Sequence, residues 1–283
     1  MLGAIIGDMV GSIYEIQPCK TKDFNIFDNR MRMSDDSYLT IAVGKAILKH
    51  YPIKYDSESL KAFQDDVIKE FLLMCRKHIN AGFGGMFIKW YVEWEETGKV
   101  SPPYNSYGNG SAMRISPVGW IAKSVDEVKT LSRVVSEVTH NHPEGLKGAE
   151  AIALCIYYAL HGLSKEEIKE IMVRDYYPEI KDFNFNDLVK SYTYNASCQG
   201  SVPQAIYCFL ISNSFEDTLR NCVAIGGDTD TIGAMAGSIA EAYYERLNLS
   251  KFTKKFIYLM VDLDVEELVK KFHNVIGSGK EFK

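Results

Sequence analysis

The sequence of 283 residues contains six cysteines but no pair spaced as Cys-x-x-Cys. Paired thiols of this kind are the usual sequence sign of a zinc site, so zinc is not expected. Cys75, Cys155 and Cys222 lie on apolar helical faces. We therefore predict buried, reduced thiols without a chemical role.

Long apolar runs, a leader segment and basic clusters are also missing. The longest apolar runs fall far short of the roughly 20 residues that a bilayer-spanning helix needs. Residues 1–8 have neither the basic start nor the cleavage site of a signal peptide. The net charge is −5 and the basic residues are scattered, so no electrostatic attraction to nucleic acid is expected. We predict a cytoplasmic protein that contacts neither a membrane nor nucleic acid.

Sustained alternation of apolar and polar residues, the mark of a strand, does not occur, and no long linker divides the chain. Apolar residues recur instead at helical spacing in 35–50, 59–79 and 145–161. The last of these helices should end at His161-Gly162, because glycine tolerates the left-handed conformation that closes many helices. The prediction is an all-α fold, with one compact domain of many helices over residues 1–283.

Capping residues mark further helix starts. A serine or aspartate followed three residues later by glutamate can satisfy the free N–H groups of a first turn. Proline also suits a first turn, since its missing N–H is not needed there. These signals are Ser124 with Glu127, Ser164 with Glu167, Asp264 with Glu267, and Pro203. The least helical stretches, expected to form surface or site-building loops, are 16–33, 80–86, 98–112, 174–187 and 192–202.

The stretch that begins at residue 231 is rich in small residues. Gly233 and Gly237 lie one turn apart in it, and each interior glycine costs about 1 kcal/mol of helix stability relative to alanine. Close approach of neighbouring helices would offset that cost. We predict a central helix that is packed on several sides and holds the residues just before it deep in the protein.

Two acidic clusters stand nearly 200 residues apart, each before an apolar helical run. They are Ser34-Asp35-Asp36-Ser37 and Gly226-Gly227-Asp228-Thr229-Asp230-Thr231. Four carboxylates repel one another strongly in a small buried site unless cations neutralise them. If the clusters meet, they form a site for one or two hard divalent cations. The alternative is that each cluster only caps its helix.

The second cluster needs a special backbone to act as a chelator. Asp228 and Asp230 would diverge by about 200° on a regular helix. They can therefore bind one ion together only if they precede the helix in a turn, for which Gly226-Gly227 supplies the freedom. Thr231 then serves as a helix cap or as a hydroxyl ligand.

A third polar segment runs from Ser106 to Arg114 and contains Gly108 and Gly110. Glycines at this spacing let backbone N–H groups approach an anion closely, and a diphosphate would suit such a nest. The segment is not a Walker A loop, because no Gly-Lys-Ser/Thr follows. An ordinary loop is the alternative interpretation.

Together these segments match a known family. In order, they are Gly3 to Ser12 with Glu15, Ser34 to Ser37, Ser106 to Arg114, Val138-Thr139-His140 with Pro143 and Gly148-Ala149, and Gly226 to Thr231 with its small-residue helix. The chain resembles the ADP-ribosylglycohydrolases, which include dinitrogenase reductase activating glycohydrolase and the ADP-ribosyl-acceptor hydrolases. The resemblance implies an all-helical fold and a cleft that holds two Mg²⁺ or Mn²⁺ ions.

The resemblance also implies roles for individual residues. The implied metal ligands are Ser34, Asp35, Asp36, Asp228, Asp230 and Thr231, with serine at 34 and 37 where the family usually has threonine. Glu15 resembles an acid that approaches the metals or the scissile bond. The implied substrate contacts are Gly84, Ser106, Tyr107, Gly108, Asn109, Gly110 and His140. Among them, His140 would touch the ribose or a phosphate rather than a metal.

Four neighbouring residues are expected to be structural. Asp8 is flanked by glycine at a helix start, where an aspartate is usually a cap. His142 stands two residues after His140 and should face elsewhere. Trp90 and Trp94 are one turn apart and should pack in the core or at its rim.

The implied activity is metal-dependent removal of ADP-ribose from a modified protein or peptide side chain. Asp35 or Asp36 would act as the base toward water, and Glu15 would assist proton transfer at the leaving group. Arginine and serine linkages both remain open, although Ser106-Tyr107 and Glu15 favour serine. The alternatives are a phosphohydrolase of nucleotide diphosphates, a catalytically silent relative that binds ADP-ribose, and a structural Ca²⁺ site.

Overall fold

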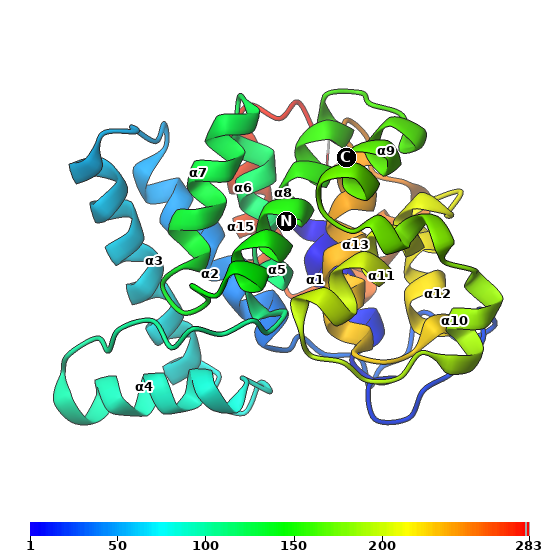
Figure 1. Cartoon of the computed structure of the whole chain (residues 1–283), viewed down its shortest axis with the longest axis horizontal. Helices are drawn as coiled ribbons and strands as arrows, with labels where there is room; N and C mark the ends of the chain where they lie inside the picture. The colour runs from blue at the N-terminus through cyan, green and yellow to red at the C-terminus, as the bar shows by residue number, and fades with distance from the viewer. Residues whose placement is uncertain (281, 283) are drawn as a thin grey trace.

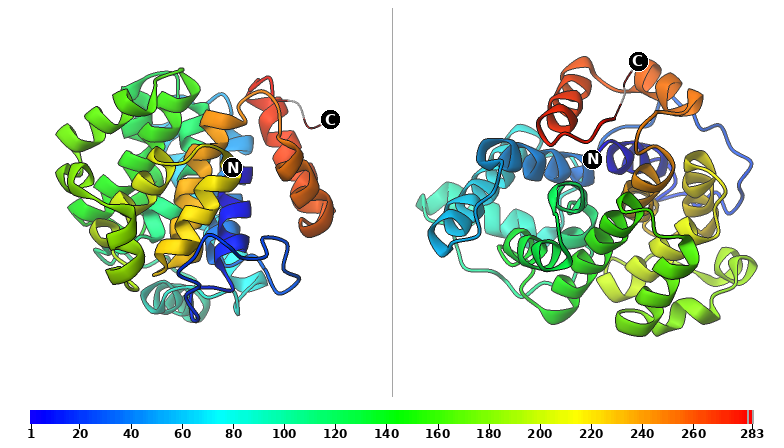
Figure 2. Two further views of the ribbon diagram at one scale, coloured as in Figure 1. Left: turned by 90° about the vertical axis from the view of Figure 1, so that its right-hand side faces the viewer. Right: turned by 90° about the horizontal axis from the view of Figure 1, so that it is seen from above.

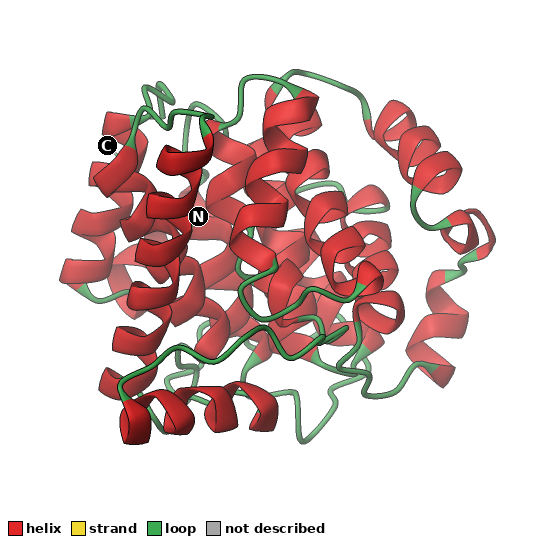
Figure 3. Cartoon of the chain, turned by 60° about the vertical axis from the view of Figure 1, so that its left-hand side comes forward, coloured by secondary structure: helices red, strands yellow, loops and turns green. Residues whose placement is uncertain are grey.

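The computed structural model describes residues 1–280 and 282. In that part of the chain every regular element is a helix, and strand-like pairing is limited to one isolated bridge between Gly108 and Ser197 (Figure 3). The predicted all-α fold is confirmed. The helices are α1 (Leu2–Gly11), α2 (Asp35–His50), α3 (Ser57–Lys77), α4 (Gly85–Thr97), α5 (Gly110–Met113), α6 (Ser116–Ile121), α7 (Val125–Ser136), α8 (Pro143–Leu160), α9 (Lys165–Asp175), the 3₁₀ helix η1 (Pro178–Asp182), α10 (Phe185–Ser191), α11 (Cys198–Leu210), α12 (Phe215–Ile225), α13 (Thr229–Tyr244), α14 (Lys251–Met260) and α15 (Leu263–Val275).

Helix α13 occupies the middle of the molecule (Figure 1). Every residue from Thr229 to Ala242 is buried, and α1, α8, α11 and α12 pack around this helix. The small residues that weaken an isolated helix therefore let several neighbours approach at once. This confirms the predicted central helix and explains its composition.

Helices α1 and α13 touch along their glycines. A β-carbon placed on Gly7 would lie 1.9 Å from the carbonyl oxygen of Gly233, and one on Gly237 would lie 2.3 Å from the carbonyl oxygen of Gly3. Residue numbers rise along one helix as they fall along the other, so the pair is antiparallel. The two backbones are thus in direct contact, with no room for a side chain between them. The contact fixes the register of the helices, with Gly3 opposite Gly237 and Gly7 opposite Gly233.

The predicted helix limits are confirmed at several points. Helix α8 ends at Leu160, and Gly162 follows with a left-handed φ of 82°. Ser164 and Glu167 form the full reciprocal capping box at the start of α9. Ser124 caps α7 by accepting a hydrogen bond from the N–H of Glu127. Local hydrogen bonds decide these ends, which is why the sequence alone reveals them.

Two helix starts were wrongly predicted. Helix α15 begins after Asp262, so Asp264 lies inside the first turn rather than before it. Pro203 lies in the interior of α11 and not in its first turn. Ser197 starts that helix earlier by accepting a hydrogen bond from the N–H of Gly200. The stretch 192–202, expected to be a loop, is thus partly helical.

The C-terminal helices α14 and α15 form a layer on one side of the molecule, next to α1 (Figure 2). A buried polar group fastens this layer to α13. Lys280 donates a hydrogen bond of 2.6 Å to Glu241, and the terminal ammonium of Met1 donates one of 2.9 Å. Burial alone would raise the pKa of Glu241, but these cations hold it well below its ordinary value.

The burial expected for Cys75, Cys155 and Cys222 is confirmed. All six are free thiols, and five of them are buried, with Cys19 only partly covered. Within the described residues, none of the helices combines the length and apolar character of a bilayer-spanning segment.

Candidate active site

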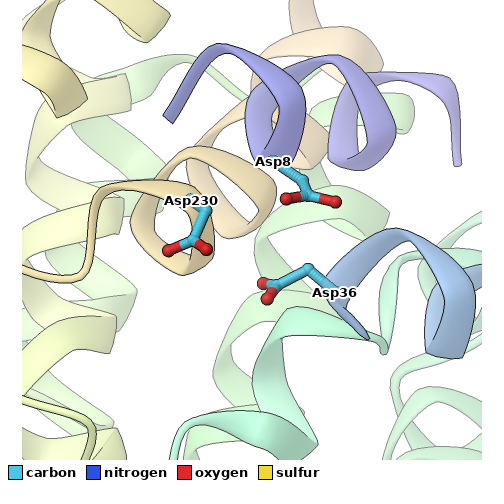
Figure 4. A group of neighbouring side chains, drawn as sticks. All are labelled: Asp8, Asp36 and Asp230. Carbon is cyan, nitrogen blue, oxygen red and sulfur yellow. The ribbon is translucent and has the colours of Figure 1, made fainter. Parts of the chain in front are cut away.

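The two acidic clusters meet in one cleft of about 370 Å³. Its walls include Asp35 and Asp36 from the first turn of α2, and Asp228 and Asp230 from the start of α13. Figure 4 shows the carboxylates of Asp8, Asp36 and Asp230 converging from three different helices. Asp8 lies on α1 and Asp230 on α13, so the close pairing of these two helices brings their carboxylates together.

The position of Asp8 corrects the sequence-based interpretation. It lies in the interior of α1, so it cannot cap that helix. Its buried carboxylate instead accepts hydrogen bonds from the N–H and hydroxyl of Ser34, both at 2.8 Å, and from the N–H and hydroxyl of Ser37. Asp8 therefore caps the N-terminus of α2 although it lies on another helix. Both serines of the first acidic cluster donate hydrogen bonds to it.

Glycines shape the second cluster as predicted. Gly226 and Gly227 have left-handed φ values of 70° and 83°, which ends α12 and turns the chain into α13. Asp228 is the N-cap residue of α13, so Thr231 is not, and Asp230 already lies in the first turn. Thr231 instead directs its hydroxyl at Asp36, 3.2 Å away. Because Asp228 stays outside the helix, the two aspartates do not diverge as regular helical residues would.

The carboxylates form two overlapping groups that each suit a cation. Within each group, oxygens of the three residues lie within 4.8 Å of one another. One group is Asp8, Asp36 and Asp230, the other is Glu15, Asp228 and Asp230, and Asp230 belongs to both. In addition, Oδ1 of Asp36 is buried without a hydrogen-bond partner. An orphaned carboxylate oxygen among oxygen donors is what a hard divalent cation would satisfy.

Electrostatics at this end of the cleft are unfavourable for the protein alone. Burial, followed by the charges of Asp8, Asp228 and Glu15, raises the pKa of Asp35 to about 8. Burial and neighbouring carboxylates also raise the pKa values of Asp36 and Asp230 well above the ordinary range. A bound cation would remove this penalty, because it favours the ionised form of every ligand.

Divalent cations are therefore expected to stabilise the fold more as the pH rises. Cation binding needs ionised carboxylates, and a raised pKa means that these groups give up their protons only at higher pH. At about 100 times the dissociation constant, binding contributes about 2.7 kcal/mol, which is a rise in Tm of about 5 °C for a chain of this size. The gain in Tm on replacing EDTA with Mg²⁺ should be larger at pH 8.5 than at pH 6.5.

Some groups outside the site also make the Tm depend on pH. One is His273, whose pKa burial lowers to about 4. Their contribution is the same in EDTA and in Mg²⁺, so it cancels when the two solutions are compared at one pH. Thermal unfolding followed by calorimetry measures the gain. A gain that is the same at both pH values would contradict this electrostatic account.

Another part of the cleft wall is built around His140. A β-carbon on Gly110 would lie 3.2 Å from Nε2 of His140, and one on Gly108 would lie 3.6 Å from it. The two glycines thus make room for the imidazole. The N–H of Gly108 is already taken by the hydroxyl of Ser106 at 3.1 Å. The anion nest predicted for this loop therefore has one donor fewer than its sequence indicates.

A buried chain of polar groups lies behind His140. Arg114 is fully buried and donates a hydrogen bond of 2.7 Å from Nη2 to the hydroxyl of Thr139. That hydroxyl lies 2.8 Å from Nδ1 of His140. Burial, with the charge of Arg114, lowers the pKa of His140 well below its ordinary value. His140 is therefore a neutral imidazole near pH 7.

The remaining residues named from the sequence are placed as follows. Asn109 links the glycine-rich loop to the acidic groups by donating a hydrogen bond of 2.7 Å to Asp228. Gly84 lines the cleft at the start of α4. The ring of Tyr107 does not line the cleft, because it is exposed and packs edge-on against His142. Contact between Tyr107 and a nucleoside stays a prediction.

Of the four residues that were expected to be structural, His142, Trp90 and Trp94 have that role, and Asp8 is the exception described above. His142 caps α8 by accepting a hydrogen bond from the N–H of Glu144 at 3.1 Å, so it does face elsewhere. Trp90 is buried in the core, and Trp94 lies at its rim under the guanidinium of Arg76.

Several lining residues were missed by sequence reasoning. They come from segments without an acidic or glycine-rich motif, and they include Arg32, Asn80, Tyr194 and Ala196. Tyr194 lies in the stretch 192–202, whose non-helical character was the one available hint. Arg114 was part of a recognised motif, but nothing in its spacing predicted a buried cation.

Comparisons with known proteins show what the whole chain is similar to. A family model described as ADP-ribosylglycohydrolase matches residues 1–279. The ADP-ribosylhydrolase ARH3 of Mus musculus is 26% identical over 86% of this chain and 82% of its own length. The ADP-ribosyl-dinitrogen reductase glycohydrolase of Rhodospirillum rubrum is 23% identical over 75% and 69%. A solved structure described as an ADP-ribosylglycohydrolase-related protein complex superimposes with a TM-score of 0.71 and 21% identity, covering 98% of this chain and 97% of that one.

Proposed function

Because the chain belongs to the ADP-ribosylglycohydrolase family, we propose that it hydrolyses the bond between ADP-ribose and a modified protein side chain, with two divalent cations, Mg²⁺ or Mn²⁺, in its acidic groups. The observation that carries the proposal is the sharing of Asp230 by two three-carboxylate groups at one end of the cleft. The same cleft also offers a neutral imidazole, His140, and a polar loop, which suit the diphosphate and nucleoside of the ligand. Named relatives that act on ADP-ribosyl groups support the same activity.

The acidic end would hold the distal ribose. Bound there, the cations would be held by Ser34, Asp35, Asp36, Asp228, Asp230 and Thr231, with Glu15 and Asp8 close by, and would supply orientation of the ribose hydroxyls and activation of water. Cleavage at an anomeric carbon develops positive charge, which the surrounding carboxylates stabilise.

Three of these acids can move protons. Asp35 and Asp36 line the cleft, and either carboxylate, kept ionised by the bound cations, could accept a proton from water. Glu15 is half-buried beside Asp228, and burial followed by that charge raises its pKa. Glu15 can therefore return a proton to the leaving side chain.

His140 would act as a directed hydrogen-bond donor to the ligand. The guanidinium of Arg114 can only donate, which leaves the hydroxyl of Thr139 free to donate its own hydrogen to Nδ1 of His140. The positive charge of Arg114 also favours the tautomer that turns its lone pair toward it. The proton then resides on Nε2, which faces the loop of Gly108 and Gly110.

Replacing Thr139 with valine is expected to raise KM about tenfold and to leave kcat nearly unchanged. The variant keeps the shape of the side chain but no longer holds the tautomer, and one hydrogen bond to the ligand is worth about 1.4 kcal/mol. Thr139→Ser keeps the hydroxyl and should restore KM. Nitrogen NMR of the imidazole reads the tautomer directly, and a wild-type proton on Nδ1 would contradict the assignment.

The proposed activity is tested with peptides that carry ADP-ribose on arginine or on serine, in Mg²⁺ and in EDTA. Intact ADP-ribose should be released from at least one of them, and only with the cation. Mass spectrometry of the products separates the other possibilities. Release of AMP would indicate a phosphohydrolase, and tight binding of ADP-ribose without turnover would indicate a silent relative.

A further inference from the structure

A second cavity lies beside the candidate active site. We propose that this cavity binds the polypeptide next to the ADP-ribosylated residue, so that the protein recognises its acceptor as well as the ADP-ribose. The inference rests on the proposed function and deepens it. The residues that line this cavity include none of the proposed catalytic acids and no residue of the loop from Ser106 to Gly110.

The cavity has a volume of about 480 Å³, and apolar and polar side chains share its lining. Four methionines from three separate segments line it, namely Met9, Met31, Met33 and Met260. Its wall also carries Tyr38, whose ring stacks on His78 with centroids 3.7 Å apart. Methionine is flexible and polarizable, so such a surface can adapt to side chains of different shape. This suits an enzyme that meets one modification in many sequences.

A thin ridge separates the cavity from the cleft. Arg32, Asn80 and Ala81 line both hollows, so the two share a wall. The carbonyl of Ala81 accepts a hydrogen bond of 2.9 Å from the N–H of Asp35, which fixes the ridge to the acidic end. In the proposed complex, the bond to the acceptor lies at that end. A polypeptide attached there reaches the cavity by crossing only this ridge.

The rim gives the cavity a charge preference. Arg32 and Lys77 are exposed at its edge, and Asp262 is the one acidic side chain among its lining residues. The excess of positive charge contrasts with the acidic cleft beside it and attracts an acidic residue of the acceptor. The preferred acceptor therefore has an apolar residue next to the modified one and an acid nearby.

Exposed apolar residues extend the same surface. Leu259 and Leu263 flank the segment that contributes Met260 and Asp262, with 51% and 76% of their surface exposed, and Ile79 on the ridge is 45% exposed. A partner that covers the cavity would also cover these side chains. Continuity with the cleft identifies that partner as the substrate protein.

Met260→Glu tests the inference, because it places a charge in the cavity at a residue that does not line the catalytic cleft. Two substrates with the same linkage are compared, a free ADP-ribosylated amino acid and a ten-residue peptide modified beside leucine and aspartate. The variant should lower kcat/KM about tenfold for the peptide, as expected for losing the burial of one apolar side chain. The value for the free amino acid should not change.

Two further variants complete the experiment. Lys77→Glu should lower the peptide's kcat/KM about threefold and relax the preference for a neighbouring acid. Tyr258→Glu adds the same charge to α14 at a side chain that is 87% exposed and outside the cavity, so it should change neither substrate. Circular dichroism verifies that each variant is folded.

The outcomes separate this inference from the proposed function. Equal effects of Met260→Glu on both substrates, or no effect on the peptide, would overturn the acceptor site while leaving the hydrolase intact. Sedimentation provides another decisive result, since a wild-type dimer that Met260→Glu dissociates without loss of peptide hydrolysis would make this face an interface between copies. Failure of the wild-type protein to hydrolyse either substrate would overturn the proposed function itself.

Discussion

Replacing Asp230 with asparagine is expected to reduce the release of ADP-ribose at least about 1,000-fold, the largest loss for any single side chain of the cleft. Asp230 is shared by both carboxylate groups, so one change takes a ligand from each. The same variant should be more stable than the wild type in EDTA. Burial and the charges of Asp228, Asp8 and Glu15 oppose its ionisation, and the amide removes that penalty.

The opposite signs of these effects make the prediction specific. Turnover of ADP-ribosylated peptide in Mg²⁺ measures the first, and Tm in EDTA measures the second. Asp187→Asn is the matched control, because Asp187 is an exposed acid in α10 and should change neither value. An Asp230→Asn protein that is both active and less stable in EDTA would contradict the shared-ligand account.

Replacing Gly7 with alanine is expected to destabilise the fold by about 4 kcal/mol or more, beyond the usual range for a single substitution. The added methyl group would lie 1.9 Å from the carbonyl oxygen and 2.3 Å from the carbonyl carbon of Gly233. Both are backbone atoms of a helix packed on several sides, so neither can rotate away. Helices α1 and α13 must separate, and the Tm should fall by about 10 °C.

Gly85→Ala is the control for this prediction. No atom lies within 4 Å of a β-carbon at Gly85, which is the first residue of α4. That variant should keep its Tm within about 2 °C of the wild type. Chemical denaturation of both variants gives the difference in free energy of unfolding. A Gly7→Ala protein as stable as Gly85→Ala would show that the two helices are not held together by this contact.

The sequence predicts those parts of the molecule that depend on local bonds or on composition. The cap at Ser164 and the turn at Gly226-Gly227 follow from chemistry within a few residues, and the structure has both. The central position of α13 follows from Gly233 and Gly237, because only close packing can justify their cost. The convergence of the two acidic clusters was one of two interpretations that their composition left open, the other being separate helix caps, and the folded chain brings both clusters to one cleft.

Other features depend on contacts that the sequence does not display. Asp8 appeared to be a cap of its own helix, yet its hydrogen-bond partners are Ser34 and Ser37 on another helix. Arg32 and Tyr194 reach the cleft from loops whose paths are set by packing. No periodicity or motif marks such residues, so only the folded chain identifies them.

The glycine contact between the first helix and the thirteenth has a consequence for biosynthesis. Asp36 leaves the ribosome 194 residues before Asp230, which at about 10 residues per second is a delay of roughly 20 s. Throughout that interval the nascent chain carries Asp8, Glu15 and Asp36 but lacks Asp230, so it cannot assemble either carboxylate group. If the proposed function holds, unfinished molecules would therefore neither capture cations nor compete for modified proteins, and catalytic competence would arrive in one late step of translation.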